Sequence, residues 1–70
     1  MKYVGTKEVL KAVLEQKTKK VYISKNADMK VVSDIINLCN EKNIALEYVD
    51  TMDELGKMSG IDVGAATAAE

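Results

Sequence analysis

The sequence predicts an α/β protein, because segments with the residue pattern of strands alternate with segments that have helical periodicity. Residues 20–24 (KVYIS) and 44–49 (IALEYV) are rich in β-branched, aliphatic and aromatic residues, as strands are. Helices of about 8 to 15 residues between such strands imply crossover connections, and so a largely parallel sheet with helices on its faces. No linker, repeat or low-complexity segment interrupts the 70 residues, so we expect a single domain over residues 1–70.

The first third of the chain is expected to hold the end of a short strand, one helix and the strand at residues 20–24. Residues 1–4 form the end of the short strand. Thr6 can cap the helix by accepting a hydrogen bond from a free backbone N–H. The helix runs to about Lys17, and its apolar face holds Leu10, Val13 and Leu14, with Val9 at the margin.

The middle of the chain predicts a second helix followed by the strand at residues 44–49. Asn26 or Asp28 caps this helix, and Asn43 suits a left-handed exit from it. The apolar face is formed by Val31, Val32, Ile35, Ile36 and Cys39. Cys39 is therefore expected to be a small buried apolar residue and not a nucleophile.

The residue pattern in the last third of the chain predicts a short helix and a final strand. Thr51 with Glu54 three positions later has the pattern of a capping box, and Ser59-Gly60 ends the helix. An apolar stretch then runs from Ile61 through Val63 and Ala65, and strand propensity falls in the alanines that follow.

The composition excludes several classes of site. One cysteine and no histidine leave no disulfide and too few ligands for structural zinc, so we expect neither a metal nor a cofactor. No apolar run approaches the roughly 20 residues of a membrane span, and the first residues do not resemble a signal peptide. We therefore expect a soluble, cytoplasmic protein without membrane contact. So short a chain buries only about 60% of its unfolded surface, which implies modest stability.

The charges are unevenly distributed along the chain. Residues 1–30 carry eight lysines against three carboxylates, a net charge of +5, whereas residues 31–70 carry two lysines against eight carboxylates, a net charge of −6. This pattern fits either ordinary solvated surface charge or a basic face that attracts phosphates while the other side keeps the molecule soluble.

The stretch GTKEVLK, residues 5–11, places three charged residues at a helix entrance. At about 100° per residue, Lys7, Glu8 and Lys11 lie together on the side opposite the apolar face. In a purely structural interpretation, Glu8 complements the helix dipole and pairs with Lys11. In a functional one, Gly5 and the free amides at Thr6 admit a ligand, the lysines donate to phosphates or guanines, and Glu8 accepts from bases.

Four blocks of the sequence stand out, GTKEVLK, KVYISKNAD, LCNEKNI and ELGKMSGIDVGAA. In this order and spacing they resemble the ribosomal protein L7Ae/L30e family of kink-turn RNA-binding proteins, and above all its small bacterial paralogues. The match runs over nearly the whole chain. The resemblance implies a three-layer α/β/α sandwich around a small mixed sheet, without enzymatic activity. It also implies binding to kink-turns, sharply bent RNA elements with sheared G·A pairs and a bulged nucleotide.

The resemblance also assigns roles to individual positions. The residues that read the G·A pairs in relatives correspond to Gly5, Lys7, Glu8 and Lys11. The loop that touches the bulged nucleotide corresponds to Ile61, Asp62 and Val63, and the basic or polar positions near the RNA backbone correspond to Lys20 and Lys25. Two departures stand out. Lys7 replaces the asparagine of many members and can donate but not accept hydrogen bonds, and the chain is short at both termini relative to the family.

The sequence therefore predicts a non-enzymatic, monomeric RNA-binding module, ribosome-associated or regulatory. Its partner would be a kink-turn in ribosomal RNA or a riboswitch. The alternative is a protein-interaction module on the same scaffold that uses the acidic half. An enzyme of phosphotransfer or nucleotide type is disfavoured, because the chain has no histidine, no arginine and no glycine-rich phosphate loop.

Overall fold

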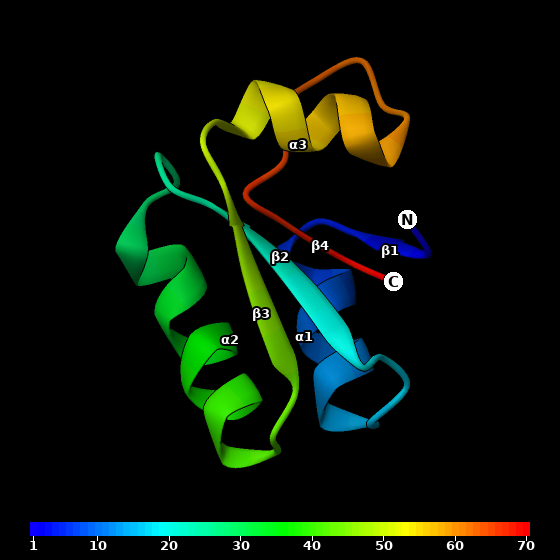
Figure 1. Cartoon of the computed structure of the whole chain (residues 1–70), viewed down its shortest axis with the longest axis vertical. Coiled ribbons are helices and arrows are strands. Elements are labelled where there is room, and N and C mark those ends of the chain that lie inside the picture. Colours follow the sequence, from blue (N-terminus) through cyan, green and yellow to red (C-terminus); the bar gives the residue numbers. More distant parts are fainter.

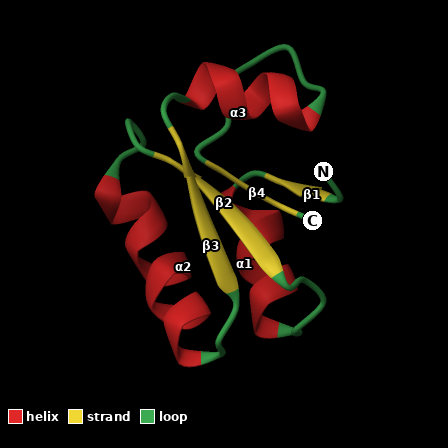
Figure 2. Cartoon of the chain, viewed as in Figure 1, coloured by secondary structure: helices red, strands yellow, loops and turns green.

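The computed structural model describes all residues from Met1 to Glu70 and contains three helices and four strands. Figure 2 distinguishes helices, strands and loops. In chain order the elements are β1 (Tyr3–Val4), α1 (Thr6–Leu14), β2 (Lys20–Ser24), α2 (Met29–Glu41), β3 (Ala45–Val49), α3 (Met52–Ser59) and β4 (Thr67–Ala69). The predicted order of helices and strands is confirmed, and no helix has the length and apolar character needed to cross a membrane.

The sheet is mixed, with the strand order β1-β4-β2-β3. β2 pairs with β3 in parallel, but β4 is antiparallel to both of its neighbours, β1 and β2. The expectation of a largely parallel sheet was wrong because α3 is short and crosses one end of the sheet (Figure 1). The chain therefore enters β4 from the edge at which β3 ended and must run back in the opposite direction. The mixed sheet that the family resemblance implied is confirmed.

The helices form layers on both faces of the sheet. One face is covered by α1 and α2, whose Val9, Val13, Val32, Ile35 and Cys39 join a buried cluster with residues of β2 and β4. On the other face, Leu55 of α3 belongs to a second cluster with Tyr22, Val49, Ala65 and Ala68. This arrangement is the predicted three-layer α/β/α sandwich. Because α3 covers only one end of its face, the rest of that face is open (Figure 1).

The last strand lies later in the sequence than predicted. Residues 61–66 form a loop, and the strand is formed by the Thr-Ala-Ala segment Thr67–Ala69. All three of its residues are buried, because β4 lies between β1 and β2 with helices packed over it. At such a position close packing favours small side chains, and this overrides the low strand propensity of alanine.

The start and end of α1 also differ from the prediction. Thr6 does not cap the helix: Gly5 is the N-cap residue, with φ 96° and ψ 153°, and no side chain caps the first turn. The helix ends at Leu14, which is 53% exposed, whereas Val9 is fully buried at the centre of the apolar face. The apolar face is therefore turned toward Val9, Ala12 and Val13.

The other predicted helix ends are confirmed. Asp28, and not Asn26, caps α2 by accepting a hydrogen bond from Lys30 N at 2.9 Å. Thr51 Oγ1 accepts from Glu54 N at 3.1 Å at the start of α3. The exit residues Asn43 (φ 59°) and Gly60 (φ 77°) both have left-handed backbone conformations. On α2, Val32, Ile35 and Cys39 are buried, whereas Val31 is 43% exposed.

Candidate nucleic-acid interface

The amino end of α1 has backbone donors without partners inside the helix. The N–H groups of Thr6, Lys7 and Glu8 lie in the first turn, where no helical carbonyl stands four residues earlier to accept a hydrogen bond. Gly5 has no side chain that could cap them. In contrast, α2 and α3 are capped by the side chains of Asp28 and Thr51. The entrance of α1 is thus the one helix start in this fold that keeps all its amides free of side-chain caps.

The backbone at Gly5 is anchored to the sheet. Gly5 N donates to Thr67 O at 3.0 Å, and Thr67 pairs with Ile23 near the carboxyl end of β2. A Cβ atom at Gly5 would meet no atom within 4 Å, so glycine is needed here for its positive φ and not for space. The result is a fixed helix start with an open surface beside it.

The predicted charged residues of α1 are exposed together. Lys7, Glu8 and Lys11 are all accessible to solvent, and none of them takes part in the chain's three ion pairs. The pairing of Glu8 with Lys11 that the structural interpretation proposed is absent from those pairs. Glu8 still complements the positive end of the helix dipole. The side chains of all three residues are thus free to contact a ligand.

The loop that the sequence singled out lies at the same end of the sheet as this helix start. Ile61 is partly buried, and it packs against the same cluster of buried residues as Val4, the residue that precedes Gly5. Asp62 and Val63 are exposed, and Val63 is 70% accessible. The structure therefore brings the amino end of α1 and residues 61–63 to the same end of the sheet, although more than fifty residues separate them in the chain.

Lys25 belongs to the same end of the molecule. It directly follows β2, and its backbone N–H donates to Val49 O at 2.8 Å, at the carboxyl end of β3. Its side chain is exposed and forms an ion pair with Asp50, at 3.2 Å between Lys25 Nζ and Asp50 Oδ1. Part of the charge that Lys25 offers to a phosphate is therefore already balanced.

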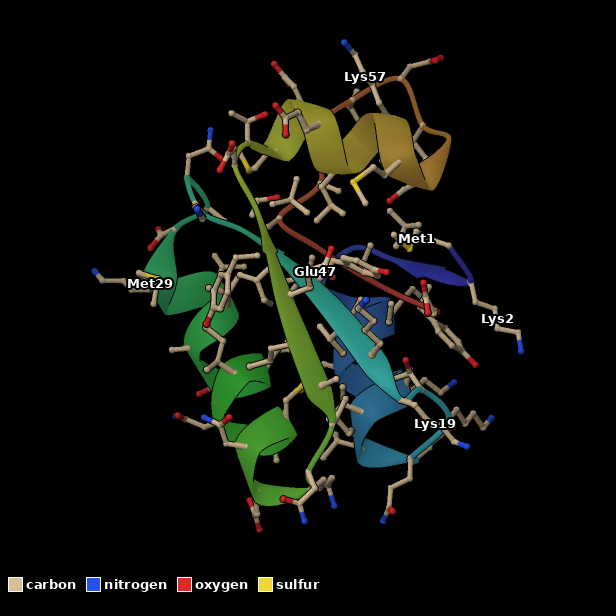
Figure 3. The ribbon with its side chains drawn as sticks, viewed as in Figure 1. Met1, Lys2, Lys19, Met29, Glu47 and Lys57 are labelled. Atoms are coloured by element: carbon tan, nitrogen blue, oxygen red, sulfur yellow. The ribbon has the colours of Figure 1, made fainter.

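Lys20 lies at the opposite end of β2 from the other predicted residues. Its ammonium group contacts Glu47 Oε1 at 2.9 Å and lies 5.1 Å from the centre of the Tyr22 ring. These partners, Glu47 first, raise the pKa of Lys20. Figure 3 shows Glu47 on the part of the sheet face that α3 leaves open. The structure therefore does not bring Lys20 together with Gly5, Lys25 and the loop.

One cavity, of about 320 Å³, lies near the carboxyl-terminal ends of α1 and α2. It is lined by Gln16, Thr18, Lys19, Lys42, Asn43 and Ile44. Figure 3 shows Lys19 at the opposite end of the molecule from α3. The cavity is therefore separate from the surface formed by the start of α1 and residues 61–63.

Sequence reasoning missed the residues that hold this surface together. Asn26 Oδ1 accepts a hydrogen bond from Met52 N at 2.9 Å, and buried Ser24 Oγ donates to Ala65 O at 2.6 Å. These pairs are 26 and 41 residues apart, so no local pattern could have indicated them. From the sequence, Asn26 was a candidate cap for the second helix, a role that Asp28 takes.

The chain matches the ribosomal protein L7Ae/L30e/S12e/Gadd45 family over residues 3–70 and belongs to it. The resemblance drawn from the four sequence blocks is thereby confirmed. The chain is 58% identical over 67 residues to RNA-binding protein TTE2299 of Caldanaerobacter subterraneus subsp. tengcongensis, and the match covers 96% of this chain and 82% of that protein. It is 46% identical over 66 residues to RNA-binding protein BH0128 of Halalkalibacterium halodurans, covering 94% of this chain and 80% of that protein.

More distant relatives show the same fold. The chain superposes on the Giardia lamblia 15.5kD RNA binding protein with a TM-score of 0.88 at 25% identity, over 94% of this chain and 56% of the other. A Bacillus halodurans protein described as of unknown function gives a TM-score of 0.84 at 21% identity, over 94% of this chain and 66% of the other. The family description names ribosomal proteins, and TTE2299 and BH0128 are named as RNA-binding proteins, which confirms the prediction of a non-enzymatic protein.

Proposed function

We propose that this protein binds RNA and recognises a kink-turn through the amino end of α1 and residues 61–63. One observation carries the proposal: the uncapped start of α1, with three exposed charged residues, lies at the same end of the sheet as an exposed loop of mixed polar and apolar character. Membership of the L7Ae/L30e/S12e/Gadd45 family supports it, as do the names of two similar RNA-binding proteins, TTE2299 and BH0128.

The start of α1 is suited to the tandem G·A pairs. Gly5 lets the RNA approach the backbone closely, and the free first-turn amides are donors. Lys7 and Lys11, one turn apart, donate to guanine O6 and N7 or to phosphates. Glu8 would be repelled by phosphates, so its place between two lysines favours acceptance of hydrogen bonds from base amino and imino groups. Such contacts read base edges and give selectivity as well as affinity.

Residues 61–63 are suited to the bulged nucleotide. Val63 offers an exposed apolar surface for a base, and Asp62 offers a carboxylate that can accept from a base. Ile61 supports the loop from the buried side. Lys25 contributes a contact to the RNA backbone at the same end of the molecule. Lys20 would reach only RNA that extends past the opposite end of β2.

Binding of this kind stabilises the bent RNA. A protein that contacts the kinked state and not the extended one shifts the RNA equilibrium toward the kink by the difference between its two affinities. The protein acts as a monomer in this proposal, on a kink-turn of ribosomal RNA or of a riboswitch. Its role would be ribosome-associated or regulatory, and it would act in the cytoplasm.

The test is a titration of two RNAs of equal length and charge, one with a kink-turn and one a straight duplex. The proposal expects clear preference for the kink-turn, with a salt dependence that reflects the lysine contacts. Equal binding of both RNAs would remove kink-turn recognition, and absence of binding to either would favour the alternative of a protein-interaction module.

A further inference from the structure

The loop that carries residues 61–63 is packed against α3 through backbone atoms. Ile61 N donates to Gly56 O at 3.0 Å. A Cβ atom at Gly56 would overlap the carbonyl oxygen of Val63, and it would lie 3.0 Å from the carbonyl carbon of Val63 and 3.2 Å from Gly64 Cα. All of these are backbone atoms, so no flexible side chain could move aside. Only glycine at position 56 permits this approach.

The end of the loop is held from two sides. Ala65 N donates to Met52 O of α3 at 3.0 Å, and Ala65 O accepts from Ser24 Oγ of β2 at 2.6 Å. Ser24 is only 2% exposed, so its hydroxyl cannot contact a ligand directly. The peptide groups on both sides of Ala65 are thereby fixed to an α-helix and to a central strand.

The loop after β2 is tied to the same helix residue. Asn26 Oδ1 accepts from Met52 N, and Met52 O accepts from Ala65 N. The segment that carries Lys25 and the segment that carries residues 61–63 therefore meet at one residue of α3. A shift of Met52 would therefore disturb both segments.

We propose that Gly56, Ser24 and Asn26 are positioning residues for RNA recognition: they hold residues 61–63 in the conformation that receives the bulged nucleotide. This inference rests on the proposed function. Because the loop is ordered before RNA arrives, binding loses little conformational entropy there. Gly56 and Ser24 cannot touch the RNA themselves, since both are buried. The three residues thus affect contacts to the bulged base and leave the contacts of α1 with the G·A pairs intact.

The experiment is a cycle that combines protein variants with two RNAs. One RNA is an intact kink-turn, and the other carries an abasic site in place of the bulged nucleotide, which keeps the backbone but removes the base. Gly56→Ala, Ser24→Ala and Asn26→Ala should each lose about tenfold in affinity for the intact RNA and match the wild type on the abasic RNA. Asn26→Asp keeps the acceptor and should restore the ratio of the two affinities, although its charge lowers both.

Ile35→Val is the matched control, because it removes a methylene from the core beneath α2, on the opposite face of the sheet from α3. It should lower stability and leave the ratio of affinities unchanged. Urea denaturation of every variant establishes that it is folded at the titration temperature, and Ser24→Ala and Asn26→Ala test the inference if Gly56→Ala does not fold.

Two results would overturn the inference. If the variants weaken both RNAs equally, the three residues act on general stability alone. If the wild type prefers the intact RNA and the variants keep that preference, the loop does not depend on them, while the proposed function stands. A wild-type protein that binds kink-turn and straight RNA alike would instead remove the proposed function, and this inference with it.

Discussion

Replacement of Gly5 by alanine isolates the energetic cost of the backbone conformation that starts α1. Gly5 has φ 96° and ψ 153°, a region that is essentially restricted to glycine. A Cβ atom there would meet nothing within 4 Å, so the substitution adds strain without a collision. The change therefore measures the backbone term alone.

The expected loss of stability follows from two opposing terms. A residue held in such a region costs about 1–3 kcal/mol. The reduced freedom of the unfolded chain returns about 0.4–1 kcal/mol when glycine becomes alanine. The two ranges leave a net loss between about zero and 2.6 kcal/mol in the free energy of unfolding, with a central value of about 1–2 kcal/mol. For a domain of this size each kcal/mol shifts Tm by about 4–8 °C, so Gly5→Ala should lower Tm by about 4–16 °C.

Thermal and urea denaturation provide the assay, with Gly60→Ala as the matched control. Gly60 also has open space around it, but its φ of 77° and ψ of 26° lie in the left-handed region, which other residues can adopt at smaller cost. Gly5→Ala should therefore destabilise more than Gly60→Ala. The reasoning is refuted if Gly5→Ala unfolds at the wild-type midpoint, or if it destabilises less than Gly60→Ala.

Three further predictions concern binding, burial and pH. Glu8→Ala should cost about 1–3 kcal/mol in kink-turn binding and reduce the discrimination between kink-turn and straight RNA. Lys25→Ala should weaken the binding of all RNAs alike and flatten the salt dependence. Titrations at several salt concentrations distinguish the two effects, and an unchanged affinity for Glu8→Ala would contradict base reading. Thr67→Val should stabilise the protein by about 1 kcal/mol, because Thr67 Oγ1 is buried without a hydrogen-bond partner; a lower urea midpoint would contradict this. Burial raises the pKa of the Cys39 thiol, so the folded state keeps a proton that the unfolded state loses above about pH 8.5. The free energy of unfolding should therefore fall as pH rises past that value, and it should fall less steeply in Cys39→Ala.

The local features of the fold could be predicted from the sequence because their causes are local. The limits of β2 follow from a run of strand-forming residues that is flanked by polar ones. Asp28 and Thr51 act as caps through bonds to backbone groups two or three residues away. Gly60 ends its helix for an equally local reason, the left-handed conformation that glycine adopts without strain.

The features that depend on distant contacts could not be predicted from local patterns. The alanines of β4 form a strand because they lie between two other strands, where small residues pack well. The direction of β4 depends on the end of the sheet at which the chain emerges from α3. The prediction of a mixed sheet came only from the family resemblance, because residue periodicity indicates the elements and not the order or direction in which strands pair.

The candidate site was predictable in part for the same reason. Helical periodicity predicted that Lys7, Glu8 and Lys11 would be exposed together. The sequence pattern assigned the cap to Thr6, since a hydroxyl residue before an apolar run is the usual signal of a cap. It did not indicate that Gly5 starts the helix without a side-chain cap. The bond from Ser24 to Ala65 joins residues 41 positions apart in the chain, so it leaves no trace in the local sequence.

The most direct test of RNA docking at this end of the sheet is an amide NMR titration of the labelled protein with kink-turn RNA. The account predicts large shifts for the amides of Thr6, Lys7 and Glu8 and for residues 61–64, with little change at Asn43 and Ile44 beside the distant cavity. Shifts concentrated at the cavity or at Asp53 and Glu54 in the first turn of α3, with the start of α1 unchanged, would contradict it.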